Sequence, residues 1–271
     1  KAIKLGTRLI IVGDVDQLPS VGAGNVLKDL IESNFIKVVR LKDIFRQGQE
    51  SLIVVNAHKI NNGEMPVLNR RDGDFFFENK EDVNEILRTI IDLINRRLPN
   101  YNKKWDNFRD IQILTPTRKG ALGVQNLNNQ LQEVLNPKAK HKKEKELKEI
   151  IFREGDKVMQ TKNNYSLKWV RINGDGDNEG VGVFNGDMGY IESINDEEKN
   201  ITVIFDDERR VVYDYVYLDE LELAYAITIH KSQGSEFKVI ITPAFMGSPF
   251  LMNKNLLYTA ITRAKELVVV V

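Results

Sequence analysis

Short, mainly apolar runs alternate along this chain with segments of helical periodicity. Residues 7–14 (TRLIIVGD), 110–117 (DIQILTPT) and 237–243 (FKVIITP) are runs of the first kind, and each is closed by Gly-Asp or by proline. A run that is apolar on both faces is typical of a strand buried inside a parallel sheet. Residues 81–98 and 123–135 instead repeat apolar side chains at the spacing of an amphipathic helix. Strands that alternate with helices predict an α/β fold with a mainly parallel sheet.

The same alternation extends toward both ends of the chain. Gly63, with Pro66 beyond it, marks the end of one expected helix. The further helices that we expect cover residues 24–33, 51–63 and 255–264. The further strands that we expect cover residues 35–41, 74–77, 221–228 and 266–271. Polar residues follow several of these strands, which is where α/β sheets bind their ligands.

The pattern changes between residues 152 and 218. Short strands separated by Gly, Asn and Asp turns follow one another there, with no helical stretch between them. This pattern is typical of a small antiparallel barrel or sandwich. Because α/β segments resume after residue 218, we expect the β module to be inserted into the α/β domain. The mixed-charge run at 138–149 in front of it is expected to be a solvated loop or a helix end.

Composition limits the partners and the kind of site. The 39 basic and 39 acidic side chains cancel, so a nucleic-acid site must be a local patch of the surface. The absence of cysteine excludes disulfides and cysteine-ligated zinc and fits a cytoplasmic setting, and the three histidines are too scattered for a metal site. No apolar run approaches the roughly 20 residues that span a bilayer, so we expect no membrane segment.

The chain contains no phosphate loop of the form G-x-x-x-x-G-K-[ST]. Two acidic strand ends, at 203–208 (VIFDDE) and 216–220 (VYLDE), look like the Mg²⁺-binding strand of phosphate-loop enzymes. Both lie in or beside the β module and no phosphate loop precedes them, so we interpret them as surface acids. Lys1 in place of an initiator methionine, and an apolar run at the other end, suggest a fragment of a longer protein.

Five segments resemble the motifs of one enzyme class, in the order that the class shows. Residues 13–24 (GDVDQLPSVGAG) resemble motif III of superfamily 1 helicases, 41–47 (LKDIFRQ) motif IV, 226–241 (AITIHKSQGSEFKVII) motif V and 256–271 (LLYTAITRAKELVVVV) motif VI. Residues 153–165 (REGDKVMQTKNNY) resemble an SH3-like module inserted between motifs IV and V. Together the segments resemble the RecD/TraA branch of superfamily 1 DNA helicases, the 5′→3′ class.

This resemblance implies a RecA-like, P-loop NTPase-type fold with an inserted SH3-like β-barrel. Residues 1–40 would be the tail of the first RecA-like domain, 41–151 and 219–271 the second RecA-like domain, and 152–218 the barrel. Motifs I and II, which carry the phosphate loop and the Mg²⁺ ligands, would then lie upstream of Lys1. ATP and Mg²⁺ are accordingly implied for the full-length protein, with no metal ligand in this chain.

The resemblance also assigns candidate residues on the ATP side. Gln17 follows an expected strand, where its amide either senses the γ-phosphate, as in the family, or forms part of a turn. Arg46 and Arg263 are implied to be arginine fingers, which accelerate phosphoryl transfer by about 10³–10⁵, although an isolated arginine more commonly forms a surface salt bridge. Glu236 is implied to bind the ribose of ATP, and Gly234 to allow close approach of the backbone.

The candidate contacts to DNA come from three segments. Thr228, His230 and Ser232 alternate after a strand, so in extended geometry their side chains would lie on one side. Hydroxyl, imidazole and amide groups suit phosphate contacts with little base specificity. The full set is Thr115, Thr117, Arg118, Thr228, His230, Lys231, Ser232 and Gln233, with Asn163, Asn164 and Asn185 in the β module. Tyr165 and Trp169 either stack on bases or fill the core of the barrel.

The implied function is an ATP-dependent helicase that moves along single-stranded DNA in repair, recombination or conjugation. The implied partners are single-stranded DNA, ATP, the first RecA-like domain and, in one variant, subunits of a nuclease complex. The alternatives are a non-catalytic nucleic-acid-binding module and a nicotinamide-dependent enzyme, which would need a G-x-G-x-x-G that is absent after the first strand. A lone helicase, an exonuclease subunit and part of a relaxase all stay open, and we expect the fragment alone not to hydrolyse ATP.

Overall fold

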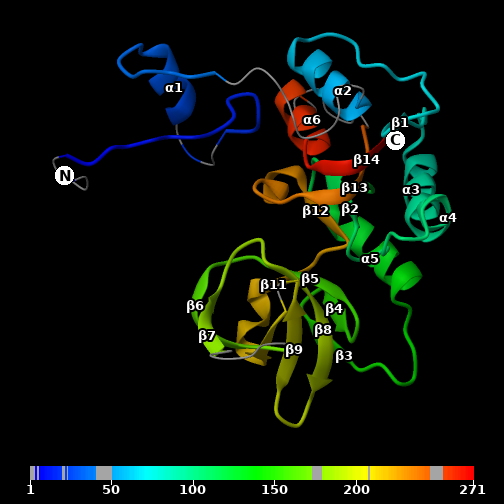
Figure 1. The fold of residues 1–271 in the computed structure, drawn as a ribbon. Helices are drawn as coiled ribbons and strands as arrows, with labels where there is room; N and C mark the ends of the chain where they lie inside the picture. Colours follow the sequence, from blue (N-terminus) through cyan, green and yellow to red (C-terminus); the bar gives the residue numbers. More distant parts are fainter. Residues whose placement is uncertain are drawn as a thin grey trace.

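The computed structural model describes residues 4, 6–19, 22, 24–40, 51–172, 179–206, 208–244 and 253–271. Within them lie a parallel sheet of five strands, an antiparallel sheet of seven strands and a two-stranded hairpin. Figure 1 shows the two larger sheets as separate parts of the molecule, with helices around the parallel one. The segment that resembles motif IV, including Arg46, lies outside the described residues.

The parallel sheet has the strand order β1-β14-β13-β2-β12. Its strands are β1 (Phe75–Phe77), β2 (Ile111–Thr115), β12 (Ala226–Thr228), β13 (Phe237–Thr242) and β14 (Ala264–Val270). Every pairing within it is parallel. β2 is buried along its whole length, as a run that is apolar on both faces predicts. The α/β class predicted from the sequence is confirmed for this part of the chain.

Helices cover both faces of the parallel sheet. They are α2 (Leu52–Asn61), α3 (Val83–Asp92), the π-helical turn η1 (Leu93–Arg97), α4 (Leu98–Tyr101), α5 (Val124–Leu135) and α6 (Lys254–Ile261). Ile111 and Ile113 of β2 join the core formed with α3 and α5, whereas Leu114 joins the core formed with α2 and α6. Because successive side chains of a strand point to opposite faces, the sheet is the middle of three layers.

Local sequence accounts for where several helices begin and end. Ser51, Asp82 and Asn253 each accept a backbone hydrogen bond at a helix N-terminus, at α2, α3 and α6. Gly63 takes a left-handed conformation (φ 76°) just after α2, which a residue without a Cβ adopts without strain. The helices predicted at 51–63, 81–98 and 123–135 are therefore confirmed.

The antiparallel sheet has the strand order β11-β5-β8-β9-β10-β6-β7. Its strands are β5 (Lys157–Gln160), β6 (Asn164–Arg171), β7 (Glu179–Val183), β8 (Met188–Asn195), β9 (Asn200–Phe205), β10 (Arg209–Asp214) and β11 (Leu221–Leu223), with a 3-10 turn η2 (Tyr215–Glu220) before the last. The predicted antiparallel module is thus present. In the part of the chain that the structure describes, no pairing joins β11 to β7, so closure into a barrel remains a prediction.

The charged run at 138–149 differs from the solvated loop or helix end predicted for it. β3 (Glu144–Leu147) pairs with β4 (Ile150–Arg153) around Lys148, which has a left-handed backbone (φ 57°). The buried guanidinium of Arg153 donates to Glu144 Oε1 across the hairpin at 2.7 Å. Opposite charges that face each other on neighbouring strands stabilise such a pairing, which allows this charged sequence to form a hairpin.

The apolar run at 221–228 forms two strands in two different sheets, so the single strand predicted there is wrong. β11 pairs with β5 in antiparallel fashion, and β12 pairs with β2 in parallel. The antiparallel sheet therefore extends to Leu223, past the boundary predicted after residue 218. Hydropathy does not mark the change of sheet, because both strands are buried in apolar cores.

The N-terminal segment lacks the strands predicted for it. Residues 7–14 and 35–40 contain no strand, and their apolar side chains are exposed, Val12 by 91% and Phe35 by 93%. A strand needs a neighbour to take up its backbone hydrogen bonds, and no described strand pairs with either segment. The helix predicted at 24–33 is present as α1 (Val26–Glu32), but none of its side chains is buried.

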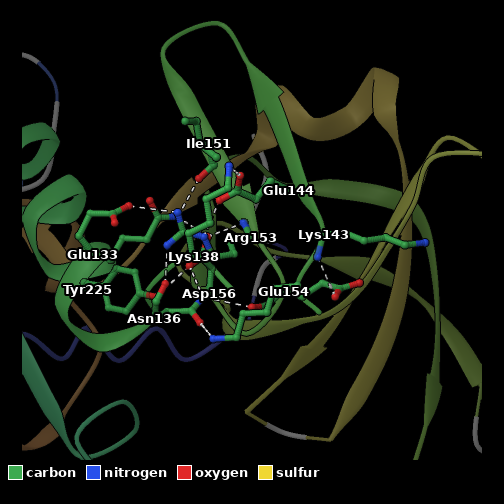
Figure 2. A network of polar contacts seen from close by, with 12 residues as sticks. Glu133, Asn136, Lys138, Lys143, Glu144, Ile151, Arg153, Glu154, Asp156 and Tyr225 are labelled. Atoms are coloured by element: carbon green, nitrogen blue, oxygen red, sulfur yellow. Dashed lines mark hydrogen bonds and ion pairs between the residues drawn. The ribbon is translucent and has the colours of Figure 1, made fainter. Parts of the chain in front are cut away.

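A buried polar network joins α5 to the β module (Figure 2). Asp156, next to β5, is fully buried and accepts hydrogen bonds from Gln132 Nε2 (2.6 Å) and Asn136 Nδ2 (2.7 Å). The hydroxyl of Tyr225, between β11 and β12, donates to the same carboxylate at 2.9 Å. Burial raises the pKa of Asp156, and its donors oppose that shift by stabilising the carboxylate. The network therefore ties the module to the parallel-sheet part where the chain enters the module and where it leaves.

Candidate nucleotide and nucleic-acid interface

Residues 14–18 lie against α6 and form one side of the candidate site. Gln17 is half-buried, and its Nε2 donates to Asp14 Oδ2 at 3.0 Å. The hydroxyl of Tyr258, on α6, donates to the same oxygen at 3.1 Å. Burial, and next the charge of Asp14, raises the pKa of Tyr258, so this hydroxyl stays protonated and remains a donor. Gln17 thus stabilises a turn and lies beside the helix that leads to Arg263.

The backbone of Leu18 is bonded by two segments that are distant in sequence. Its N–H donates to Thr259 Oγ1 on α6 at 2.9 Å, and its carbonyl accepts from Gln233 Nε2 at 2.7 Å. Its side chain is buried in the core that α2 and α6 share. Gln233 is predicted to contact DNA, yet its amide donates to Leu18 in the structure. Leu18 and Thr259 lie inside the segments that resemble motifs III and VI, but neither is a predicted site residue, because their role depends on a contact between distant segments.

Arg263 follows α6 directly and is only 7% exposed. Its Nε donates to Thr259 O at 3.3 Å, and its Nη1 donates to Ser235 O at 3.4 Å. The guanidinium therefore lies largely buried between α6 and the loop at 233–236. Gln17 is thus linked to α6 through Asp14, which Tyr258 also binds, and Arg263 bonds the same helix at Thr259.

Glu236 and Gly234, the two predicted ribose-side residues, lie in this same loop. Glu236 forms an ion pair with Lys265 Nζ at 3.2 Å. Gly234 has a left-handed backbone (φ 85°), and no atom lies within 4 Å of an added Cβ. Its conformation, and not a lack of space, is therefore what favours glycine there.

The loop after β12 is not extended, so the one-sided alternation predicted for Thr228, His230 and Ser232 is wrong. Residues Ile229–Ser232 form a 3-10 helix (η3), and Thr228 Oγ1 caps it by accepting from Lys231 N at 3.3 Å. Ser232 is fully buried, and its hydroxyl donates to Ile229 O at 2.8 Å. His230 is exposed. A capping threonine ends the strand because its hydroxyl satisfies a backbone N–H of the new turn.

The loop after β2 meets the loop after β12 at Glu222. Arg118 Nη2 lies 2.7 Å from Glu222 Oε1, and Lys231 Nζ lies 2.8 Å from Glu222 Oε2. Thr117 is half-buried, whereas Thr115 is fully buried and its hydroxyl donates to Leu122 O at 2.6 Å. The carboxylate of Glu222 therefore holds two predicted DNA-binding cations together. No motif in the sequence marks this glutamate.

Glu222 lies on β11 of the antiparallel sheet, so the ion pairs also connect that sheet to both loops. Burial raises the pKa of Glu222, but hydrogen bonds and charge from Lys231 and Arg118 outweigh it and lower the pKa below its ordinary value. The carboxylate is thus charged at neutral pH. A small cavity lined by Arg118, Thr228 and Lys231, with Met159 on the module side, adjoins the pairs.

The predicted asparagines of the β module have different environments. Asn164 is buried, and its Oδ1 accepts from the backbone N–H groups of Ser166 (3.0 Å) and Leu167 (3.2 Å). It therefore shapes the start of β6 from inside. Asn163 and Asn185 are exposed neighbours, and Asn185 N donates to Asn163 Oδ1 at 2.9 Å. Only these two of the predicted asparagines present side chains to solvent.

The two aromatic candidates of the module also differ. Tyr165 is 71% exposed and meets Phe184 edge to face, with ring centroids 5.8 Å apart. Trp169 is half-buried and covers Gly180 of the neighbouring strand, where an added Cβ would come within 2.4 Å of the indole. The guanidinium of Arg209 lies 5.9 Å from the Trp169 ring. Trp169 therefore packs on the sheet, and Tyr165 is the one with an accessible ring.

Two kinds of site find no support in the described part of the chain. No group of three or more His, Asp and Glu side chains there is arranged to hold a metal ion. Of the helices that the structure describes, none has the length and apolar character needed to cross a membrane.

Comparison with protein families identifies three regions of the chain. Residues 127–205 match the ATP-dependent RecD-like DNA helicase SH3 domain. Residues 223–271 match the UvrD-like helicase C-terminal domain, and residues 1–76 match an AAA domain family. These matches cover the segments that carry Gln17 and Arg263, and the β module from β5 to β9.

Curated relatives match the chain from end to end. The ATP-dependent RecD2 DNA helicase of Deinococcus radiodurans is 32% identical over 98% of this chain and 32% of its own length. The RecBCD enzyme subunit RecD of Mycolicibacterium smegmatis is 29% identical over 100% of this chain and 46% of its own length. The chain therefore spans less than half the length of either relative.

A solved structure supports the fold. The crystal structure of the Pif1 helicase from Bacteroides in complex with ADP-AlF3 and ssDNA aligns with a TM-score of 0.51 and 19% identity, over 95% of this chain and 60% of that one. At this identity the likeness concerns the fold alone. The domain matches and the RecD2 relative show that the chain belongs to the RecD-like branch of the superfamily 1 helicases.

Proposed function

We propose that this chain is part of an ATP-dependent DNA helicase that moves 5′→3′ along single-stranded DNA and separates duplex strands. The observation that carries the proposal is the hydrogen-bonded contact among residues 14–18, 233–236 and 258–263. These are the segments that resemble motifs III, V and VI. A helicase must connect the state of its nucleotide to its grip on DNA, and this contact joins the residues proposed for the nucleotide to the loop after β12, which also carries His230 and Lys231.

On the nucleotide side, Gln17, Arg46 and Arg263 are proposed to contact the γ-phosphate of ATP, and Glu236 the ribose. A guanidinium is always charged and offers paired donors, so it stabilises the negative charge that develops on the phosphoryl group. Because Arg263 is 7% exposed, solvent screens its charge less than that of a surface arginine. Mg²⁺ would neutralise phosphate charge when bound, and we propose its ligands in the phosphate-loop part of the full-length protein.

On the DNA side, we propose that the accessible candidates bind the sugar-phosphate backbone. Arg118 and Lys231 supply charge, His230 supplies a ring N–H donor, and Asn163 and Asn185 supply amides on the module. The buried candidates Thr115, Ser232 and Asn164 shape the loops that carry them. Contacts of this kind depend on charge and not on base identity, so binding would be sensitive to salt.

Exposed apolar segments support a further RecA-like domain as a partner within the same protein. Ile10 and Val12 are exposed by 75% and 91%, and Phe35 and Val39 by 93% and 75%. So many large apolar side chains exposed close together in sequence are consistent with an interface that another part of the protein covers. We propose that the rest of the protein supplies the strands that pair with residues 7–14 and 35–40.

The relatives suggest where such an enzyme works. One of them is a subunit of the RecBCD enzyme, and another is a RecD2 helicase. We propose a role in DNA repair, recombination or conjugation, in the cytoplasm, with nuclease subunits as partners if the parent resembles the first relative.

ATP hydrolysis measured for the full-length protein and for this chain tests the proposal. Single-stranded DNA is expected to stimulate hydrolysis by the full-length protein, whereas this chain alone, without a phosphate loop, is expected to show none. DNA-stimulated hydrolysis by the pure chain would contradict the assignment of its missing motifs. DNA binding without any hydrolysis by the full-length protein would instead favour a non-catalytic nucleic-acid-binding module.

A further inference from the structure

Leu18 is the one buried side chain among the described residues of 4–40. The apolar residues of 7–14 are exposed, Val15 is half-buried, and no residue of α1 is fully buried. Among the described residues, the segment that carries Gln17 is therefore anchored to the rest of the molecule by Leu18 and by the hydrogen bond from Tyr258 to Asp14. A segment held at so few points can pivot, because the described chain on both sides of Leu18 has few contacts to resist movement.

Two side chains hold this anchor by its backbone. Thr259 is fully buried, and its hydroxyl accepts from Leu18 N at 2.9 Å while donating to Asn255 O at 2.7 Å. The hydrogen bond to Asn255 O orients the Thr259 hydroxyl so that a lone pair of its oxygen faces Leu18 N. Gln233 Nε2 donates to Leu18 O at 2.7 Å from the other side. Both polar groups of Leu18 are thereby satisfied by side chains from the segments that resemble motifs V and VI.

Thr259 also contacts the candidate arginine finger, because its carbonyl accepts from Arg263 Nε at 3.3 Å. One residue thus binds the anchor through its hydroxyl and Arg263 through its backbone. Gln233 in turn lies two residues before Ser235, whose carbonyl accepts from Arg263 Nη1 at 3.4 Å. A displacement of Leu18 would therefore move Gln17 relative to Arg263 and to the loop proposed to contact DNA.

We infer that Thr259 and Gln233 are positioning residues that clamp Leu18, and through it set the position of Gln17 relative to Arg263. This inference rests on the proposed function. Neither residue contacts the nucleotide in this role, and the Gln233 side chain serves the clamp and not DNA. Through this clamp, movement of Gln17 on the γ-phosphate side is coupled to movement of the loop after β12 on the DNA side.

The test uses the full-length protein that contains this chain. Thr259→Val keeps the shape of the side chain and removes the acceptor, whereas Thr259→Ser keeps the hydroxyl. Gln233→Met removes the amide donor at similar length. Thr89→Val is the matched control, because the Thr89 hydroxyl donates to Glu85 O within α3, away from the clamp. Melting temperatures of all variants show whether each remains folded.

The kinetic readout is the split between kcat and KM for DNA-stimulated ATP hydrolysis. Thr259→Val and Gln233→Met are expected to lower kcat by roughly tenfold or more, with little change in KM for ATP, because misplacement by about 1 Å can reduce rates up to 10²-fold. Thr259→Ser should recover most of the rate. In the double variant Thr259→Val/Gln233→Met, kcat should fall by less than the product of the two single reductions, since both residues act through Leu18.

A second readout does not depend on activity. Hydrogen–deuterium exchange of the peptide containing Leu18 should accelerate in Thr259→Val and Gln233→Met and stay slow in Thr259→Ser and Thr89→Val. Unchanged exchange and an unchanged kcat in folded Thr259→Val would overturn the clamp. Absence of DNA-stimulated hydrolysis in the wild type would instead contradict the proposed function, while the exchange result would still decide whether the clamp exists.

Discussion

Glu222 shows how a single carboxylate can set the charge of the proposed DNA site. It pairs with both Arg118 (2.7 Å) and Lys231 (2.8 Å), so two cations share one anion. A DNA phosphate that approaches these cations must compete with the carboxylate, since both are anionic acceptors of the same hydrogen bonds. Glu222 holds the two loops together, and we expect it to limit the affinity of the proposed site for phosphate.

Replacement of Glu222 by glutamine should strengthen binding of single-stranded DNA, because it removes the competing charge and keeps the shape. The dependence of affinity on salt should steepen by about 0.7 in slope for each additional phosphate that the protein neutralises. Fluorescence anisotropy of a labelled oligothymidine between low and moderate salt measures both. Glu192→Gln, which breaks a pair with Arg210 at 2.6 Å on the module, is the control. Weaker binding by Glu222→Gln would show that the carboxylate mainly positions the cations.

Replacement of Arg263 by alanine in the full-length protein should abolish turnover, with a loss of about 10³-fold or more if it is an arginine finger. Affinity for single-stranded DNA should stay close to that of the wild type. Steady-state hydrolysis and DNA titration of the same preparation measure the two effects. Because Arg263 also bonds Thr259 O and Ser235 O, the melting temperature must be compared. Equal losses of turnover and DNA affinity would make it a DNA-binding or folding residue.

At the scale of elements, the start of β5 is where the two sheets are joined. Asp156 points to α5 and Tyr225 (Figure 2), and the adjacent Lys157 donates from its Nζ to Phe108 O in the loop before β2. Successive residues of an extended chain point to opposite sides. Asp156 and Lys157 can therefore contact two different elements of the parallel-sheet part, α5 and the loop before β2. Both side chains are buried, which makes this joint polar, specific and costly to open.

Lys157 gives the joint a dependence on pH. Burial lowers the pKa of Lys157 from 10.5 to about 8. The negative charges of Asp206, Asp106 and Asp110 favour the protonated form and offset part of this shift. A folded-state pKa below the unfolded value means that the unfolded chain binds more protons between the two, so stability rises with pH there. Relative to Lys157→Met, the wild type should gain up to about 3 kcal/mol between pH 8 and 10.5.

Urea unfolding of both proteins at pH 7 and pH 10.5 measures this difference. The comparison with methionine matters because other groups also titrate over this range and contribute equally to both proteins. A difference in unfolding free energy that stays constant with pH would mean that Lys157 remains fully protonated in its buried position.

At the scale of the whole molecule, the chain consists of a well-packed body and a loosely attached N-terminal segment. The parallel sheet, its helices and the antiparallel module share two apolar cores. Residues 7–14 and 35–40 contribute no strand, and their apolar side chains are exposed. We expect these segments to become strands when the rest of a RecA-like domain supplies neighbours for them.

Hydrogen exchange of backbone amides tests this expectation directly. Amides of residues 7–14 should exchange rapidly in this chain, because no described strand accepts or donates their hydrogen bonds. In the full-length protein the same amides should be protected as strongly as those of β2, which lies inside its sheet. Rapid exchange in both proteins would show that no other domain pairs with the segment.

Much of the body can be predicted from the sequence because its signals are local. β2 is an apolar run and is buried at every position, and α3 begins at Asp82, whose side chain caps it. The motif order identifies the family, and the same motifs point to Gln17 and Arg263, which the structure brings to one helix. Periodicity, caps and motifs depend on neighbouring residues, so they can be recognised without knowledge of the fold.

The partner of each buried or polar group, in contrast, follows from the folded arrangement alone. Leu221–Leu223 and Ala226–Thr228 are equally apolar, yet they belong to different sheets. Gln233 is predicted to contact DNA, yet its amide donates to Leu18, 215 positions away. Local patterns in the amino-acid sequence are thus sufficient for most elements, the motif order and the family. The clamp on Leu18, the shared carboxylate of Glu222 and the joint at Asp156 depend on the fold, because hydropathy records that a group is buried but not what it is buried against.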